Sequence, residues 1–103
     1  MSAAPKVLSN PKQVTITYQG GVISIDQDPI VLRSDYDETL EWVTNPADLE
    51  FAVCFDRESP FKDRHFHHYK THSGSIKKGA TGRYKYSIEV DGKVLDPGVL
   101  VQP

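Results

Sequence analysis

Residues 83–90 alternate without exception between polar and apolar side chains, and this pattern constrains the fold more than any other feature. Four apolar residues, Tyr84, Tyr86, Ile88 and Val90, are interleaved with four polar ones. Successive side chains of a β-strand point to opposite faces, so a period of two places all four apolar residues on one face. The segment therefore predicts a strand with one face in a core and the other in water.

Shorter β patterns recur along the chain between residues that favour turns. The expected strands are 14–18, 23–25, 30–33, 39–44, 51–55, 83–90 and 99–101. The turn signals between them include Gly20–Gly21, Asp28–Pro29, Asn45–Pro46, Asp91–Gly92 and Asp96–Pro97. About seven short strands, with turns every ~8–12 residues and no long amphipathic helix, predict an all-β fold, an antiparallel Greek-key β-sandwich.

The length of 103 residues leaves room for one domain. Residues 1–12 contain Pro5 and Pro11 and show little periodicity, so we expect a flexible N-terminal arm followed by a single domain over residues 13–103. No stretch reaches the ~20 apolar residues of a membrane span, and the first residues lack the apolar run of a signal peptide. We therefore expect a cytoplasmic protein.

The segment from Ser59 to Gly74 interrupts the β pattern. Ser59 followed by Pro60 is typical of a helix N-terminus, and Gly74 suits a helix end. The histidine and aromatic residues between them are mediocre helix formers, so an extended loop over one end of the sandwich fits equally well. We expect either an irregular or a short helical insertion over residues 59–74.

The net charge of −2 conceals an uneven distribution. From Asp26 to Glu58 the chain carries ten acidic residues and two basic ones, whereas from Lys62 to Lys93 it carries eight basic residues and three acidic ones. We expect the two parts to pair across the fold; alternatively, the acidic part of one copy meets the basic part of another. The negative total also disfavours a nucleic-acid partner.

Several strings of residues follow one another with a recognisable order and spacing. They are Gly21–Asp26 with Asp28–Ile30, Thr39–Trp42 followed by Asn45, Phe51–Asp56 and Gly82–Tyr86. Together they resemble the cupredoxin family, the plastocyanin-like blue-copper β-sandwiches, over most of residues 13–102. The chain is similar in particular to small stand-alone members that end in a Gly-x-Tyr-x-Tyr strand and an Asp-Pro turn. The resemblance implies the same sandwich fold.

Membership of this family would also imply a mononuclear copper site and electron transfer. A blue-copper centre takes two imidazoles, one thiolate and usually a weak thioether. The positions that match these ligands carry Phe51, Ile88 and Asp91, and no methionine follows them. Cys54, the single cysteine, belongs to another strand. Because phenylalanine and isoleucine have no lone pair to donate, we expect no type 1 copper site, with Phe51 and Ile88 packed as core instead.

The densest group of candidate metal ligands lies in the 59–74 segment and consists of His65, His67, His68 and His72. In a helix His65, His68 and His72 would share one face, whereas in an extended chain His65 and His67 would do so. Imidazole binds Zn²⁺, Cu²⁺ and Ni²⁺, so the alternative function is a transition-metal-binding protein. Otherwise these are histidines of a polar, partly exposed loop.

Aromatic and basic residues are interleaved in the same segment, a pattern that single-stranded nucleic acid can use. We favour a structural interpretation in which Phe61 and Phe66 anchor the segment to the sandwich. Trp42 is expected between the two sheets. Cys54 is expected to be either a free thiol that faces the outside of its sheet or a small buried hydrophobe, without catalytic activity in both cases, and a single cysteine excludes an internal disulfide.

Motifs of the common catalytic classes are missing from the sequence. It has no Gly-x-Ser-x-Gly elbow, no phosphate-binding glycine-rich loop and no His-Glu-x-x-His string. The sequence therefore predicts a non-catalytic binding or interaction module without a cofactor. Its expected partner is an unidentified protein or a second copy of the chain, rather than nucleic acid or a membrane.

Overall fold

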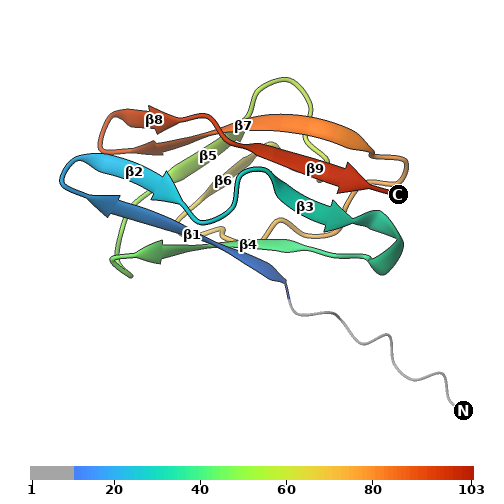
Figure 1. Ribbon diagram of the computed structural model, residues 1–103, viewed down its shortest axis with the longest axis horizontal. Helices are drawn as coiled ribbons and strands as arrows, with labels where there is room; N and C mark the ends of the chain where they lie inside the picture. The colour runs from blue at the N-terminus through green and yellow to red at the C-terminus, as the bar shows by residue number, and fades with distance from the viewer. Residues whose placement is uncertain (1–10) are drawn as a thin grey trace, which may run out of the picture.

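The computed structural model describes residues 11–103, which form nine β-strands and one turn of 3-10 helix (Figure 1). The strands are β1 (Lys12–Gln19), β2 (Val22–Ile25), β3 (Ile30–Arg33), β4 (Leu40–Asn45), β5 (Ala52–Phe55), β6 (His65–His67), β7 (Gly82–Val90), β8 (Lys93–Leu95) and β9 (Gly98–Gln102), and the 3-10 turn is η1 (Ser34–Tyr36). All seven predicted strands are present. β1 already begins at Lys12, and the rest of the predicted arm, residues 1–10, lies outside the described residues.

The strands form two sheets, which confirms the all-β prediction. The smaller sheet has the order β2-β1-β4, and the larger has the order β3-β9-β7-β5-β6, with β8 also paired to β7. The prediction of a purely antiparallel sandwich is wrong at two places, because β1 pairs with β4 and β3 pairs with β9 in parallel. Alternating side chains identify the buried face of a strand but carry no information on the direction of its neighbour.

The 59–74 segment contains no helix, so the expectation of an irregular insertion is the correct one, with β6 as its only strand. After β6 the chain reverses at His68 and Tyr69: His67 donates its N–H to the Lys70 carbonyl at 3.1 Å, and Lys70 donates back to the His67 carbonyl at 2.8 Å. We call residues 65–73 the histidine hairpin. In a helix, the backbone N–H and carbonyl groups of this segment would bond to one another and could not pair with a neighbouring strand.

The histidine hairpin joins the two sheets along one side of the sandwich. Its first arm, β6, pairs with β5 of the larger sheet. Its second arm runs along β4 of the smaller sheet, where Trp42 donates its N–H to the Thr71 carbonyl at 3.0 Å and Ser73 donates to the Leu40 carbonyl at 2.8 Å. The hairpin therefore satisfies backbone groups at two sheet edges, which would otherwise be open to pairing with another chain.

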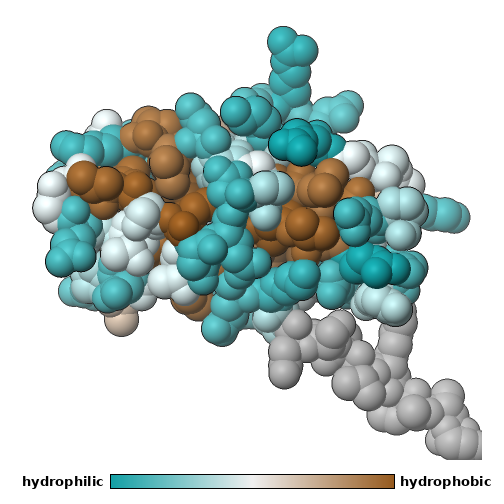
Figure 2. All heavy atoms as spheres, in the orientation of Figure 1, coloured by the Kyte–Doolittle hydropathy of each residue, from teal (hydrophilic) through white to brown (hydrophobic). Residues whose placement is uncertain are grey.

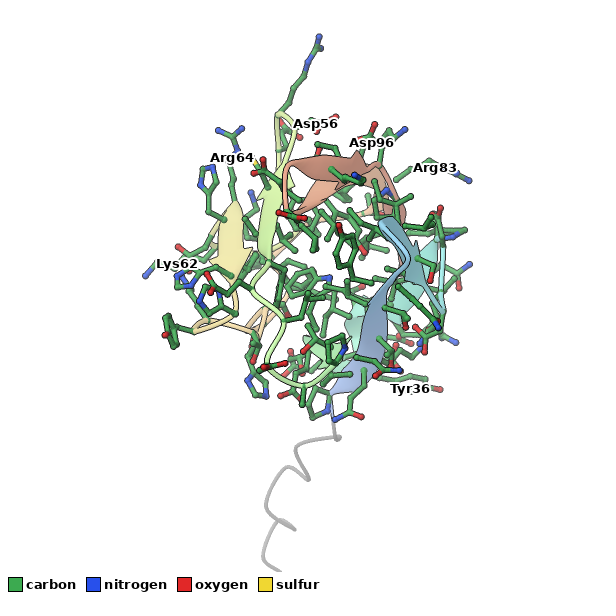
Figure 3. The ribbon with its side chains drawn as sticks, turned by 90° about the vertical axis from the view of Figure 1, so that its left-hand side faces the viewer. Tyr36, Asp56, Lys62, Arg64, Arg83 and Asp96 are labelled. Atoms are coloured by element: carbon green, nitrogen blue, oxygen red, sulfur yellow. The ribbon has the colours of Figure 1, made fainter. Side chains whose placement is uncertain are left out.

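A cluster of aromatic rings fills the centre of the space between the sheets, which Figure 3 shows end-on. The rings belong to Trp42, Phe55, Phe61, Phe66 and Tyr86, all at most 1% exposed. Ring centroids lie 5.0 Å apart for Trp42 and Phe66, and 5.1 Å apart for Phe55 and Tyr86. The predicted core position of Trp42 and the anchoring role of Phe61 and Phe66 are confirmed.

Apolar side chains also reach the surface in two separate areas. Figure 2 shows them as separate brown areas over β2 and β8 and over β3 and β9, among hydrophilic side chains. Val22 on β2 is 64% exposed and Val94 on β8 is 59% exposed, and the two strands contact each other. One apolar area thus lies where edges of the two sheets meet, and the other lies over two neighbouring strands of the larger sheet.

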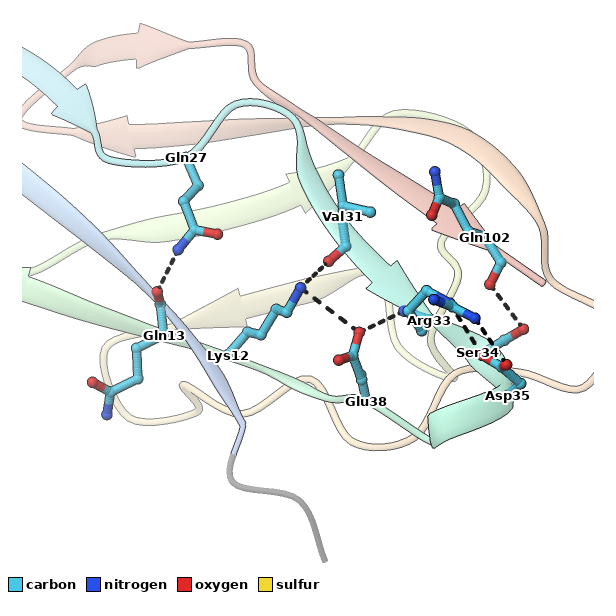
Figure 4. Close-up of polar contacts among 9 residues, drawn as sticks. All are labelled: Lys12, Gln13, Gln27, Val31, Arg33, Ser34, Asp35, Glu38 and Gln102. Atoms are coloured by element: carbon cyan, nitrogen blue, oxygen red, sulfur yellow. Dashed lines mark hydrogen bonds and ion pairs between the residues drawn. The ribbon is translucent and has the colours of Figure 1, made fainter.

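β1 and β3 belong to different sheets and do not pair with each other. Along their facing edges, side chains form the hydrogen bonds with backbone groups that a neighbouring strand would otherwise form (Figure 4). On β3, Lys12 Nζ donates to the Val31 carbonyl and the Glu38 carboxylate accepts the Arg33 N–H, both at 2.6 Å. On β1, the Gln27 side chain donates to the Gln13 carbonyl and Asp26 accepts the N–H of Thr15, both at 2.9 Å. These bonds occupy edge groups that would otherwise be open to another strand.

Replacing Glu38 with alanine should destabilise the fold by about 1–2 kcal/mol, because it leaves the Arg33 N–H without its acceptor and removes the ion pair with Lys12 at 3.7 Å. Urea unfolding followed by tryptophan fluorescence measures the change. Asp35→Ala is the matched control, since its partner is the exposed guanidinium of Arg33. Equal stability of the Glu38 variant and the wild type would contradict this account of the edge.

Candidate functional site

Three connections and the tip of the histidine hairpin gather at one end of the sandwich, at the left of Figure 1. The connections are the β1–β2 turn (20–21), the β4–β5 loop (46–51) and the β7–β8 turn (91–92). Two surface depressions flank the β4–β5 loop, with volumes of about 490 and 460 Å³. Both are lined by Asp48, Leu49 and Glu50, so this loop forms the ridge between them. We call this region the loop end.

The first depression extends from the β4–β5 loop to Tyr18, Val90 and Asp91. The Tyr18 hydroxyl donates a hydrogen bond to the Asp91 carboxylate at 3.1 Å. Desolvation, together with this hydrogen bond and the charge of Asp91, raises the pKa of Tyr18 above its usual value. Tyr18 therefore stays a neutral donor at physiological pH, and it fixes the orientation of one carboxylate at the loop end.

The second depression lies between the β4–β5 loop and the hairpin tip, His68 and Tyr69. Tyr69 is 87% exposed, the most exposed of the large hydrophobic side chains in the described chain. Its ring lies 4.3 Å from that of His68, and its backbone N–H donates to Nδ1 of His67 at 3.2 Å. Within residues 11–103, Nδ1 of His68 is buried without a hydrogen-bond partner. The tip thus exposes the Tyr69 ring to solvent, and the ring packs on one side against His68.

The residues at which the resemblance to cupredoxins predicted lost copper ligands lie beneath this end. Phe51 is 5% exposed and Ile88 is 0% exposed, and both belong to the main apolar core. Ile88 stands inside β7, opposite Val53 of β5, rather than in a loop. Asp91 is exposed and has its carboxylate bonded to Tyr18. Apolar packing therefore continues up to the base of the loops.

The four candidate histidines are spread over the histidine hairpin instead of converging. His65 and His67 are exposed on one face of β6, as expected for an extended chain, and His68 lies at the tip. His72 lies on the other arm, where its Nε2 is 3.5 Å from the Glu41 carboxylate. In residues 11–103, no three side chains of the types His, Cys, Asp and Glu form a group that could hold a metal ion.

Direct ion pairs do little to join the acidic and basic parts of the chain. Among the described residues, the one contact between them is that of the His72 imidazole with the Glu41 carboxylate, which involves no Lys or Arg. Lys70 pairs with Asp63 inside the basic part, and Arg33 pairs with Asp35 inside the acidic part. Asp48 and Glu50 take part in no ion pair within the same range. The expected pairing across the fold is therefore nearly absent from the ion pairs of this range, and the carboxylates of Asp48 and Glu50 are available at the loop end.

The position of the β4–β5 loop between two depressions was not predicted from the sequence, which indicated only a loop from Asn45–Pro46 onward. The available signal was the pair of carboxylates in Asp48-Leu49-Glu50, two residues apart in a short loop between two buried strands. The proximity of this loop to Tyr69 and Asp91 depends on the hairpin and the β7–β8 turn, which the sequence pattern did not connect to it.

Comparisons with known proteins give no family for the chain: no protein-family model, no curated protein and no solved structure matches it. Within residues 11–103 there is also no helix with the length and apolar character needed to traverse a lipid bilayer.

Proposed function

We propose that the chain is a non-catalytic interaction module that binds a basic protein segment at the loop end, on a cupredoxin-like Greek-key sandwich without a type 1 copper site. The observation that carries the proposal is the combination, at one end, of an exposed tyrosine and unpaired carboxylates around two depressions. Tyrosine is enriched among the residues that dominate binding at protein interfaces.

The proposal includes no copper centre because of the residues at the positions that match copper ligands in cupredoxins. Phe51 and Ile88 lie in the core, and Asp91 is held by Tyr18. Folding then depends on apolar packing rather than on a metal that ties the loops together. After treatment with a chelator, the protein should unfold cooperatively with an unchanged midpoint, whereas a structural metal contributes directly to folding. A clear drop in the midpoint, measured by calorimetry, would contradict this.

The chemistry of the partner follows from the charges around the ridge. Asp48 and Glu50 line both depressions, and Asp91 lines one of them. Lysine and arginine side chains can pair with these carboxylates while their methylene groups lie against Leu49 and Tyr69. A cation can also stack on the exposed Tyr69 ring. A basic, extended peptide therefore fits the loop end better than an acidic one.

The test is a titration of ¹⁵N-labelled protein with a short peptide of alternating arginine and alanine, with an alternating glutamate–alanine peptide as comparison. We expect chemical-shift changes at residues 46–50 and 68–69 with the basic peptide alone. The double variant Asp48→Asn/Glu50→Gln should bind about tenfold more weakly, since two exposed charge pairs at roughly 0.7 kcal/mol each amount to about 1.4 kcal/mol. Added salt should weaken binding as well.

The control carries the same loss of charge in another exposed loop. Asp56→Asn/Glu58→Gln removes two carboxylates from the β5–β6 connection, where Asp56 lies at the top of Figure 3, and should leave affinity unchanged. Equal weakening by both double variants would show that only net charge matters. Shift changes away from the loop end would contradict the proposed site.

A further inference from the structure

Cys54 lies on the outer face of the larger sheet, on the strand next to the edge strand β6. Along β5, Val53 and Phe55 are buried, so Cys54 between them points away from the core and is partly exposed. Its neighbour on one side is His65 of β6, and its neighbour on the other side is Ser87 of β7. The thiol is free. Of the two alternatives that the sequence left open, the outward-facing free thiol is the one present, but the sequence did not show that β6 would lie beside β5.

The hydrogen-bond pattern shows how close Cys54 and His65 are. Phe55 donates its N–H to the Arg64 carbonyl at 2.9 Å, so these two residues form a hydrogen-bonded pair of the antiparallel ladder. The next pair along, Cys54 and His65, is then a non-hydrogen-bonded pair. In such pairs the side chains approach most closely, with Cβ atoms about 4.5–5.5 Å apart.

The sulfur atom lies on the His65 side of its strand. Cys54 Sγ is 3.6 Å from the Phe55 carbonyl oxygen, which faces β6 because it also accepts the Arg64 guanidinium at 3.0 Å. On the opposite side, the Ser87 hydroxyl is bonded to the Asp96 carboxylate at 3.1 Å. Figure 3 shows Arg64 and Asp96 on the outer side of the larger sheet. His65 is therefore the neighbour available to the thiol.

We propose that Cys54 and His65 form a two-ligand site for a soft monovalent d¹⁰ metal ion, Cu(I) or Ag(I). Thiolate ligands select such ions, and imidazole also suits copper. With bond lengths similar to those of zinc sites, about 2.3 Å to sulfur and about 2.0 Å to nitrogen, two donor atoms in a line with the ion lie roughly 4.3 Å apart. The Cβ separation of about 4.5–5.5 Å in a non-hydrogen-bonded pair is compatible with this donor separation. On binding, Cys54 releases its thiol proton to solvent, a neutral His65 nitrogen donates its lone pair, and no electron is transferred.

The number of ligands determines which ions fit. Zn²⁺ prefers four tetrahedral ligands, and no group of three suitable side chains occurs in residues 11–103. A monovalent d¹⁰ ion is satisfied by two ligands in a line. His67 shares the outer face, but its cross-strand partner is Ala52, and its Nδ1 already accepts the Tyr69 N–H. The site lies on the face of the larger sheet, away from Phe51, Ile88 and Asp91, and is independent of the proposed interaction at the loop end.

The experiment titrates the reduced full-length protein with Cu(I) under anaerobic conditions, in competition with a coloured Cu(I) chelator, and repeats the titration with Ag(I) by calorimetry. We expect one equivalent of each ion to bind. Cys54→Ser, which is nearly isosteric, should lower the affinity at least about 100-fold, and His65→Ala should lower it at least about tenfold. X-ray absorption of the Cu(I) complex should show one sulfur and one nitrogen ligand.

His72→Ala is the matched control, because it removes a histidine from the other arm of the same hairpin and should leave the affinity unchanged. Far-UV circular dichroism checks that each variant is folded. Wild-type affinity in either Cys54→Ser or His65→Ala would overturn the proposal, and so would a loss in His67→Ala as large as that in His65→Ala. An ion bound only at the level of the control peptide Gly-Cys-Gly would also overturn it.

Discussion

Replacing Trp42 with alanine is expected to lower the free energy of unfolding by about 3–5 kcal/mol, the usual cost of truncating a buried aromatic residue. Trp42 is 1% exposed and is the largest fully buried side chain of the described chain. Its ring contacts Phe66 at 5.0 Å and Tyr86 at 5.8 Å between centroids. Removing it therefore leaves a cavity against β6 and β7 at the same time.

The position of Trp42 makes the loss larger than burial alone suggests. Its backbone N–H donates to Thr71 on the histidine hairpin, while its ring packs on Phe66 at the start of that hairpin. The contact between β4 and the hairpin thus depends on Trp42 through both backbone and side chain. We expect the variant to lose protection from hydrogen exchange at residues 65–73 before the rest of the larger sheet.

Denaturant unfolding followed by circular dichroism measures the effect, because the variant lacks the only tryptophan. The control is Tyr69→Ala, which truncates an aromatic residue of the hairpin that is 87% exposed and should change stability by less than about 0.5 kcal/mol. A loss below about 1 kcal/mol in Trp42→Ala would contradict the central role of this ring.

The strands with one buried face could be predicted because their alternation records that face directly. In β7 the buried residues Tyr86, Ile88 and Val90 lie two apart, as the sequence indicates. The alternation does not depend on the direction of the neighbouring strand, so the parallel pairings of β1 with β4 and of β3 with β9 could not be predicted. These pairings depend on the two connections, β2–β3 and β3–β4, through which the chain passes from the smaller sheet to the larger one and back.

Two short strands were missed for a different reason. β6 has a single buried residue, Phe66, and β8 has none. One buried position cannot establish a period of two, so such strands form because a neighbour supplies hydrogen-bond partners. β8 pairs with β7 across the Asp91–Gly92 turn, where both residues have positive φ, 51° and 76°. The turn could be predicted, but the pairing beyond it could not.

The candidate sites follow the same logic. The chemistry of single residues could be predicted, as for the apolar residues at Phe51 and Ile88. Proximity between residues of different strands could not: Cys54 and His65 are eleven positions apart, and only the pairing of β5 with β6 makes them neighbours. The absence of a helix likewise separates His65 from His68 and His72, which a helix would have aligned.

Stability should decrease steeply above about pH 10, and Tyr86 should account for much of the decrease. Its side chain is 0% exposed, and the hydroxyl has no hydrogen-bond partner within the described residues. Burial raises the pKa of Tyr86 far above its usual value, and the nearby indole N–H of Trp42, which forms no hydrogen bond of normal geometry with the hydroxyl, offsets only part of this. The folded protein therefore keeps the proton of Tyr86 at a pH where the unfolded chain, with a pKa near 10, releases it.

The sign follows from this difference in proton binding. Below pH 10 both states hold the proton, so the contribution of the neutral hydroxyl is fully present. Above pH 10 the unfolded state binds fewer protons than the folded state, so the free energy of unfolding falls with rising pH. With Tyr86 still neutral in the folded state at pH 12, the loss between pH 9 and pH 12 is about 2.7 kcal/mol.

Tyr86→Phe isolates this contribution, because it removes only a hydroxyl that has no partner. At pH 7 the variant should be as stable as the wild type or more stable by up to about 1 kcal/mol, since an unsatisfied polar group leaves the core. The lysines and the other tyrosines titrate alike in both proteins, so they cancel in the difference. Urea unfolding at several values between pH 8 and 12 measures the free energy of unfolding of both proteins. The difference, variant minus wild type, should increase by up to about 1.4 kcal/mol for each pH unit above 10. A difference that stays constant over this range would mean that Tyr86 ionises as easily in the folded protein as in the unfolded chain.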